Sequence, residues 1–265
     1  MKTFVVNLKR SPERRKYMQE LLKDFPYPWE FFEAVDGTEI KKLSEVYNET
    51  KAIHFYGKAL TRGEVGCALS HLGIYKKMID ENIDKALILE DDIILEKKFL
   101  TVLDILKNRN LHNDIILLGQ LDDYLIKNKL GKKITNEHKI YRIFNSGYGT
   151  HAYLIDVVAA KKILELNFPV RMPADDWHYL YKFINIYIIQ PYIVNQIGEK
   201  LPSNIDAIGM RDKHISVGFY EELKAQLSIF NFLVIMVRKT CSFVRIILRA
   251  IKNFFLSILP AKRIE

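Results

Sequence analysis

The stretch Lys85–Asp92 reads KALILEDD, a short apolar run that ends in three consecutive acidic residues. Its first part, Lys85–Glu90, is too short for a helix and is bounded by charged residues, so it predicts a buried central strand. The three acids, Glu90, Asp91 and Asp92, then stand at the carboxyl end of that strand, where open α/β folds bind their ligands. This stretch therefore predicts both a sheet and a ligand site at its edge.

Helix and strand patterns alternate around this strand. Thr3–Leu8 (TFVVNL) predicts a second buried strand, and Ser11-Pro12-Glu13 predicts a helix start, because it offers an N-cap, a first-turn proline and a dipole-complementing acid. Thr61–Glu64 matches a capping box that opens a helix running to about Asp80. Further strands are expected at 114–119, 140–144, 150–155 and 186–190. The alternation predicts an α/β domain around a largely parallel sheet.

The composition is that of an ordinary globular protein. Of 265 residues, 49% are hydrophobic and 27% are charged, which excludes a disordered or collagen-like chain. Two cysteines, Cys67 and Cys241, exclude a disulfide framework, and no paired Cys/His zinc spacing is visible. The N-terminal apolar run Thr3–Leu8 is too short for a signal-peptide core, so we expect a protein of the reducing cytoplasm.

The net charge of +8 is concentrated near the C-terminus. Residues 223–265 carry eight basic side chains and one acid, which leaves residues 1–222 with a balance of +1. We therefore expect a globular domain over 1–222 and a separate basic tail over 223–265.

The tail has the pattern of an amphipathic helix from about 224 to 258. Its basic residues fall in one wedge of a helical wheel, opposite large aliphatic and aromatic residues. No run reaches the roughly 20 uncharged apolar residues of a spanning helix, so we expect the tail to lie on an anionic membrane surface. A helix packed on the body or on a second copy of the chain is the alternative. A nucleic-acid partner is disfavoured, because the apolar face would have no function in phosphate binding.

The acidic triplet is suited to a divalent cation. Strand alternation places Glu90 and Asp92 on one face and Asp91 on the other, so the first two can share Mn²⁺ or Mg²⁺, which prefer hard oxygen ligands. Three acids at the end of a buried strand are costly without such a compensating charge. A cluster of helix-capping acids is the structural alternative.

Two other segments contain candidate functional residues. In the acid pair Asp175-Asp176, at least one residue can be the N-cap of a helix that begins near Trp177. The segment 146–150 (SGYGT) offers glycines for the close approach of a ligand, although so short a motif more often marks a turn. His71 is more typical of a hydrogen-bonded structural residue than of a ligand.

In order along the chain, these segments resemble glycosyltransferase family 25, the transferases of bacterial lipopolysaccharide and lipooligosaccharide outer-core synthesis, which are related to the galactosyltransferases of collagen. The resemblance covers roughly residues 1–200 and is most specific in GEVGCALSH (63–71) followed by LILEDD (87–92). The other matching segments are VNL at 6–8 with Arg10, Arg14 and Arg15, AVDG at 34–37, GTHAY at 149–153 and PAD at 173–175.

The resemblance implies a GT-A-like, Rossmann-type nucleotide-sugar-binding domain, a UDP-sugar donor that is most often UDP-galactose, a divalent metal (Mn²⁺ or Mg²⁺) and inversion at the anomeric carbon. The donor-binding residues that it suggests are Asn7, Leu8, Arg10, Arg14, Asp36, His71, Asp91, Gly149, Thr150 and His151. The triplet takes the place of the Asp-x-Asp motif of this fold, with metal contact from Glu90 and Asp92 or from Asp91 and Asp92. His151 or His178 could complete the metal shell, with a structural hydrogen bond as the alternative role.

We therefore expect an inverting, metal-dependent enzyme that moves a hexose from a UDP-sugar to a glycolipid acceptor, at the cytoplasmic face of the bacterial inner membrane. Asp175 is the expected base for the acceptor proton, and Asp176 is the alternative. Other hypotheses are the same fold with a UDP-glucose or UDP-N-acetylhexosamine donor, a retaining reaction, and a catalytically silent membrane-surface binding protein.

Overall fold

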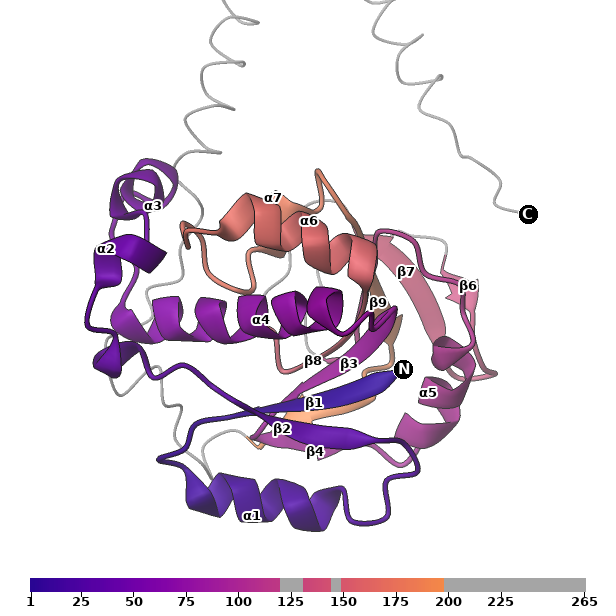
Figure 1. Cartoon of the computed structure of the whole chain (residues 1–265). Helices are drawn as coiled ribbons and strands as arrows, with labels where there is room; N and C mark the ends of the chain where they lie inside the picture. The colour runs from indigo at the N-terminus through magenta and orange to yellow at the C-terminus, as the bar shows by residue number, and fades with distance from the viewer. Residues whose placement is uncertain (120–130, 144–148, 198–265) are drawn as a thin grey trace, which may run out of the picture. The chain divides into compact units, whose positions relative to one another are not determined.

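The computed structural model describes residues 1–119, 131–143 and 149–197 (Figure 1). The predicted tail (223–265), its boundary at residue 222, and residues 146–148 of the glycine segment lie outside these ranges. Within the described ranges, no helix combines the length and the apolar character that a membrane crossing requires.

The N-terminal residues form a parallel strand-helix-strand unit. Strands β1 (Lys2–Asn7) and β2 (Trp29–Glu33) pair in parallel and are joined by α1 (Pro12–Leu21). Helix α1 begins at Pro12 as predicted, because proline fits the first turn of a helix. Strand β3 (Lys85–Glu90) also pairs with β1 in parallel, so the prediction of an internal strand here is confirmed.

The large sheet is mixed, with eight strands in the order β2-β1-β3-β8-β5-β9-β7-β6. The bounds of its other strands are β5 Asp114–Leu117, β6 Lys132–Lys133, β7 Lys139–Ile143, β8 Ala152–Asp156 and β9 Asn185–Gln190. Strands β2, β1, β3, β5, β9 and β6 run in one direction, and β8 and β7 run against them. The predicted, largely parallel sheet is therefore confirmed, with two reversed strands. A two-stranded sheet pairs β4 (Ile93–Leu95) with β10 (Val194–Gln196) in antiparallel fashion.

Helices cover both faces of the large sheet (Figure 1). Helices α4 (Arg62–Asp80) and α6 (Val157–Asn167) pack together on one face, and α1 and α5 (Phe99–Lys107) lie on the other. The shorter helices are η1 Gly37–Glu39, α2 Leu43–Val46, α3 Glu49–Tyr56 and α7 Trp177–Leu180. The predicted α/β class is confirmed for the described residues.

The capping box predicted for α4 is present. Thr61 N donates to Glu64 Oε2 at 2.7 Å, and Glu64 N donates to Thr61 Oγ1 at 3.2 Å. Two amides at the start of the helix are satisfied in this way. The helix start and its apolar stripe therefore fix the face that α4 turns to the sheet.

Strand β3 is buried on both faces. Leu87 and Leu89 belong to the core cluster shared with α1 and α5, while Ile88, which alternation turns to the other side, is also fully buried. An unpaired charge inside such a strand would cost free energy, because it would be removed from water. The acids that follow Leu89 therefore lie at the carboxyl end of the strand.

Candidate functional site

The carboxyl ends of β1 and β3 meet at one edge of the sheet. In the parallel pairing, Val6 lies opposite Glu90, so Asn7 reaches the residues that follow β3. Asn7 Nδ2 donates to Asp91 Oδ2 at 2.7 Å, and both side chains are buried. The sequence-predicted donor residues Asn7 and Asp91 are thus in direct contact.

Arg14 of α1 holds two members of the acidic triplet. Its Nη1 atom donates to Asp91 Oδ1 at 2.8 Å and to Asp92 Oδ2 at 3.1 Å. Burial favours the neutral guanidine, but the hydrogen bonds and charges of Asp91 and Asp92 outweigh it and raise the pKa of Arg14. The guanidinium is therefore a fixed positive charge that compensates both carboxylates.

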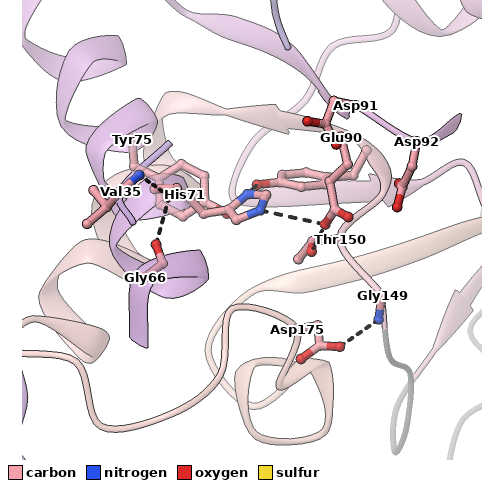
Figure 2. A network of polar contacts seen from close by, with 12 residues as sticks. Val35, Gly66, His71, Tyr75, Glu90, Asp91, Asp92, Gly149, Thr150 and Asp175 are labelled. Atoms are coloured by element: carbon pink, nitrogen blue, oxygen red, sulfur yellow. Dashed lines mark hydrogen bonds and ion pairs between the residues drawn. The ribbon is translucent and has the colours of Figure 1, made fainter. Parts of the chain in front are cut away.

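Glu90 lies on the other side of the triplet. Figure 2 shows the Glu90 and Asp92 carboxylates directed to the same side and Asp91 turned away from them, as strand alternation predicted. Thr150 Oγ1 donates to Glu90 Oε1. Burial, followed by the charge of Asp92, raises the pKa of Glu90 to about 8, against the opposing effect of the Thr150 hydrogen bond.

His71 is the neighbour of Glu90 on α4. Its Nε2 atom lies 3.9 Å from Glu90 Oε1, and its Nδ1 atom lies 2.7 Å from the Tyr153 hydroxyl, which in turn lies 2.7 Å from the Tyr75 hydroxyl. Burial lowers the pKa of His71 to about 4, so its imidazole is neutral at pH 7. A hydrogen-bonded role for His71 is thus present, as the sequence suggested.

Asp175 faces the triplet from a distant part of the chain. Its Oδ2 atom accepts the backbone N–H of Gly149 at 2.9 Å, and Trp177 Nε1 donates to the Gly149 carbonyl at 3.0 Å. Gly149 has a φ of 98°, which favours glycine at this position. Figure 2 shows the order Glu90, Thr150, Gly149, Asp175 from the triplet outward.

Asp176 has a different position from its neighbour. It is the N-cap of α7, where its Oδ1 atom accepts Tyr179 N at 3.1 Å, and it is 6% exposed. The capping role that the sequence left open for one member of the pair is therefore present in Asp176, which leaves Asp175 as the member directed to the triplet.

The remaining predicted donor residues, together with His178, have partners of their own. Arg10 pairs with Asp36, which also caps η1 through Thr38. Hydrogen bonds from Thr38, followed by the Arg10 contact, lower the pKa of Asp36 despite some burial. Leu8 follows β1 directly, and His151 is buried with its carbonyl accepting Glu90 N at 2.9 Å. His178 lies on α7 with its ring beside Tyr181.

The triplet has the donor set that a divalent cation needs. Asp92 Oδ1 is buried and makes no hydrogen bond within the described residues. Glu90 and Asp92 repel each other at this edge, as the raised pKa of Glu90 reflects. A hard cation would satisfy the orphaned oxygen and remove the repulsion, so Glu90 and Asp92 fit the predicted Mn²⁺ or Mg²⁺.

A second candidate ligand set was missed in the sequence. Cys67, His71 and Glu90 each offer one ligand atom, and these atoms all lie within 4.8 Å of one another. The sequence shows that Cys67 and His71 share one face of α4. It contains no paired zinc motif, and the third residue, Glu90, lies at the end of β3. Only the packing of α4 on the sheet brings the three together.

Comparisons with known proteins identify the family of this chain. The family model for glycosyltransferase family 25 (LPS biosynthesis protein) matches residues 1–178. Procollagen galactosyltransferase 2 of Homo sapiens is 29% identical over 184 residues, which is 66% of this chain and 29% of that protein. A glycosyltransferase 25 family member of Drosophila melanogaster is 32% identical over 174 residues, 61% of this chain and 27% of that protein. The chain thus spans less than a third of the length of these curated relatives.

Among solved structures, the galactosyltransferase LgtC in complex with donor and acceptor sugar analogs matches with a TM-score of 0.37 and 11% identity, over 71% of this chain and 73% of that chain.

The family match runs from β1 into α7 and includes Asn7, Arg14, the acidic triplet and Asp175. It covers about two thirds of the 265 residues and coincides with the segments that the sequence resemblance identified. The chain belongs to glycosyltransferase family 25.

Proposed function

We propose that this chain transfers galactose from UDP-galactose to a hydroxyl of a lipopolysaccharide or lipooligosaccharide acceptor, with inversion at the anomeric carbon. The family and the galactosyltransferase names of its relatives support the choice of sugar. The acceptor class follows the description of the family model.

One structural observation supports the chemistry most directly. Carboxylates from two distant segments, the triplet after β3 and Asp175 before α7, gather on either side of Thr150 and Gly149 (Figure 2). The charge of Asp175 is the smallest of the causes that raise the pKa of Glu90, after burial and the charges of Asp92 and Asp91. Such an arrangement offers one acidic group to the diphosphate side of a donor and another to the acceptor side.

The residues near the triplet organise the donor side. Asn7 and Arg14 fix the orientation of Asp91 and Asp92, which leaves Asp92 Oδ1 without a partner among the described residues. When bound by Glu90 and Asp92, a divalent cation supplies Lewis-acid stabilisation of the diphosphate leaving group. Rotation of these side chains is restricted by their hydrogen bonds, so the ligand oxygens are held in place before the donor arrives.

Asp175 is the proposed base. One of its oxygens is committed to Gly149 N, and this bond fixes the carboxylate plane. The other oxygen of Asp175 takes the proton of the acceptor hydroxyl. The oxygen of that hydroxyl attacks the anomeric carbon from the side away from UDP. Attack from that side inverts the configuration.

Membrane attachment completes the proposal. The basic tail predicted at 224–258 would hold the enzyme at the cytoplasmic face of the inner membrane, where a glycolipid acceptor is concentrated. Local concentration would then raise the rate of transfer without new contacts in the catalytic domain.

The direct test is transfer from UDP-galactose by the Asp92→Asn variant. We expect turnover to fall by about 100-fold or more, because one ligand of the diphosphate-bound metal is lost, while circular dichroism is unchanged. Asp80→Asn, on the exposed end of α4, is the control and should retain full turnover. Unchanged turnover in Asp92→Asn would remove the metal role, and a product with retained configuration by NMR would overturn inversion.

A further inference from the structure

We infer that Cys67, His71 and Glu90 form a second binding site, for a borderline divalent cation with Zn²⁺ as the leading candidate, at the junction of α4 and β3. Glu90 is shared with the proposed Mn²⁺ or Mg²⁺ site, but the sulfur and nitrogen ligands are not, so this site goes beyond the proposed transfer. Its three ligand atoms are sulfur, nitrogen and oxygen, and they lie within 4.8 Å of one another.

The backbone geometry places the three residues on rigid elements. Cys67 and His71 are four residues apart on α4 and therefore lie on the same helix face. Glu90 is the last residue of β3, and Figure 2 shows the His71 ring directed at its carboxylate. Ligands of tetrahedral zinc lie about 3.3 to 3.8 Å apart. The His71 Nε2 to Glu90 Oε1 distance of 3.9 Å is close to that value, and no pair needs to close by more than about 1 Å.

The Nε2 atom of His71 can act as the nitrogen ligand. The residue is 1% exposed, and its Nε2 atom is buried with no hydrogen-bond partner among the described residues. Its Nδ1 atom contacts the Tyr153 hydroxyl, which contacts Tyr75. With the proton on Nδ1, the Nε2 lone pair faces Glu90 Oε1 at 3.9 Å, and a cation between the two atoms would be a ligand partner for both.

The thiol determines which cation is favoured. Thiolate ligands favour zinc over Mg²⁺ and Mn²⁺, and three protein ligands leave a fourth position for water. On binding, the Cys67 S–H and Glu90 O–H bonds break, both protons pass to solvent, and the freed sulfur and oxygen lone pairs form bonds to the metal. Cys67 and Glu90 are both partly exposed, so ions can reach the ligands from solvent.

The test uses the full chain, stripped with a chelator and titrated with Co²⁺ as a spectroscopic substitute for zinc. We expect a thiolate-to-cobalt charge-transfer band that saturates at one equivalent and is abolished by Zn²⁺. Cys67→Ser should lose the band, and Cys241→Ser, which removes the other cysteine of the chain, should retain it. No band in the wild type, or a band that persists in Cys67→Ser or disappears in Cys241→Ser, would overturn the site.

Two further measurements separate this site from a folding defect and from the proposed transferase function. Zn²⁺ should raise the thermal midpoint of the wild type but not that of Cys67→Ser, whose zinc dissociation constant should rise at least about tenfold. Equal midpoint shifts in the two proteins would contradict the site. Asp92→Asn should keep the cobalt band even where transfer is lost, and loss of the band in that variant would mean that the two sites are one.

Discussion

Nη1 of Arg14 lies 2.8 Å from Oδ1 of Asp91, and this contact joins helix α1 to the end of strand β3. Both side chains are at most 10% exposed, and the same nitrogen also reaches Asp92. Arg14 was predicted as a donor-binding residue, and the structure adds that it pairs with Asp91 and Asp92 of the triplet.

Removing this guanidinium should destabilise the fold. Arg14→Met keeps much of the apolar stem but leaves the buried Asp91 without its cation, which costs about 3–5 kcal/mol in comparable pairs. Urea unfolding at pH 7 measures the loss. Lys16→Met, on the exposed side of α1, is the control and should change the unfolding free energy by less than about 0.5 kcal/mol. An Arg14→Met variant as stable as the control would show that the triplet needs no internal cation.

The two aspartates before α7 should separate into a catalytic and a structural role. Asp175→Asn should lower kcat by about 10²–10⁴ with little change in donor affinity, because it removes a base. Asp176→Ala should leave kcat nearly unchanged and cost about 1 kcal/mol of stability, because it removes an N-cap. Steady-state kinetics and thermal unfolding on both variants test this division. The reverse pattern would make Asp176 the base.

His71 should make the metal-free protein sensitive to acid. Because burial lowers its pKa to about 4, the unfolded chain binds a proton that the folded chain does not between about pH 6.5 and 4. Stability should fall through this window by about 1.4 kcal/mol per pH unit, roughly 3 kcal/mol in total.

Glu90 changes the stability in the opposite direction. Burial raises its pKa to about 8, so the folded chain holds a proton that the unfolded chain releases, and the free energy of unfolding falls as the pH rises. We therefore compare the wild type with His71→Asn, both in the presence of chelator. Both proteins contain Glu90, so its contribution cancels in the difference between their stabilities. The wild type should lose stability relative to the variant as the pH falls from 6.5 to 4. Parallel stability curves for the two proteins would show that the His71 imidazole is not held neutral by the fold.

The tail prediction is tested by liposome flotation. A chain ending after Glu222 should lose binding to vesicles that contain anionic lipid, while the full chain floats with them and is released by high salt. Vesicles of neutral lipid are the control and should bind the full chain more weakly. Flotation of the shortened chain with anionic vesicles would place the membrane contact in residues 1–222.

Local chemistry explains what the sequence predicted well. Pro12 at the first turn of α1 and the Thr61-Glu64 box of α4 specify helix starts within a few residues, so both were found. The direction of β8 was not predictable in this way, because strand propensity contains no information on whether a neighbour runs parallel or antiparallel. The largely parallel sheet expected from alternation is confirmed, and the reversed strands β8 and β7 are the part that alternation did not predict.

The contacts of the candidate site could also be predicted only in part from the sequence. The contact of Asn7 with Asp91 follows from two parallel strands whose carboxyl ends meet, which the sequence supports. The pairing of Arg14 with the triplet and the approach of Cys67 to Glu90 depend on how α1 and α4 dock on the sheet. Such contacts come from tertiary packing, and no spacing rule within either segment encodes them.

Gly149 links the two halves of the proposed reaction. Asp175 and Trp177 hold its two backbone polar groups, and the next residue, Thr150, donates its hydroxyl to Glu90. These two successive residues therefore connect the proposed base to the triplet, so a shift of this short stretch of backbone would move the Asp175 carboxylate and the hydroxyl on Glu90 together.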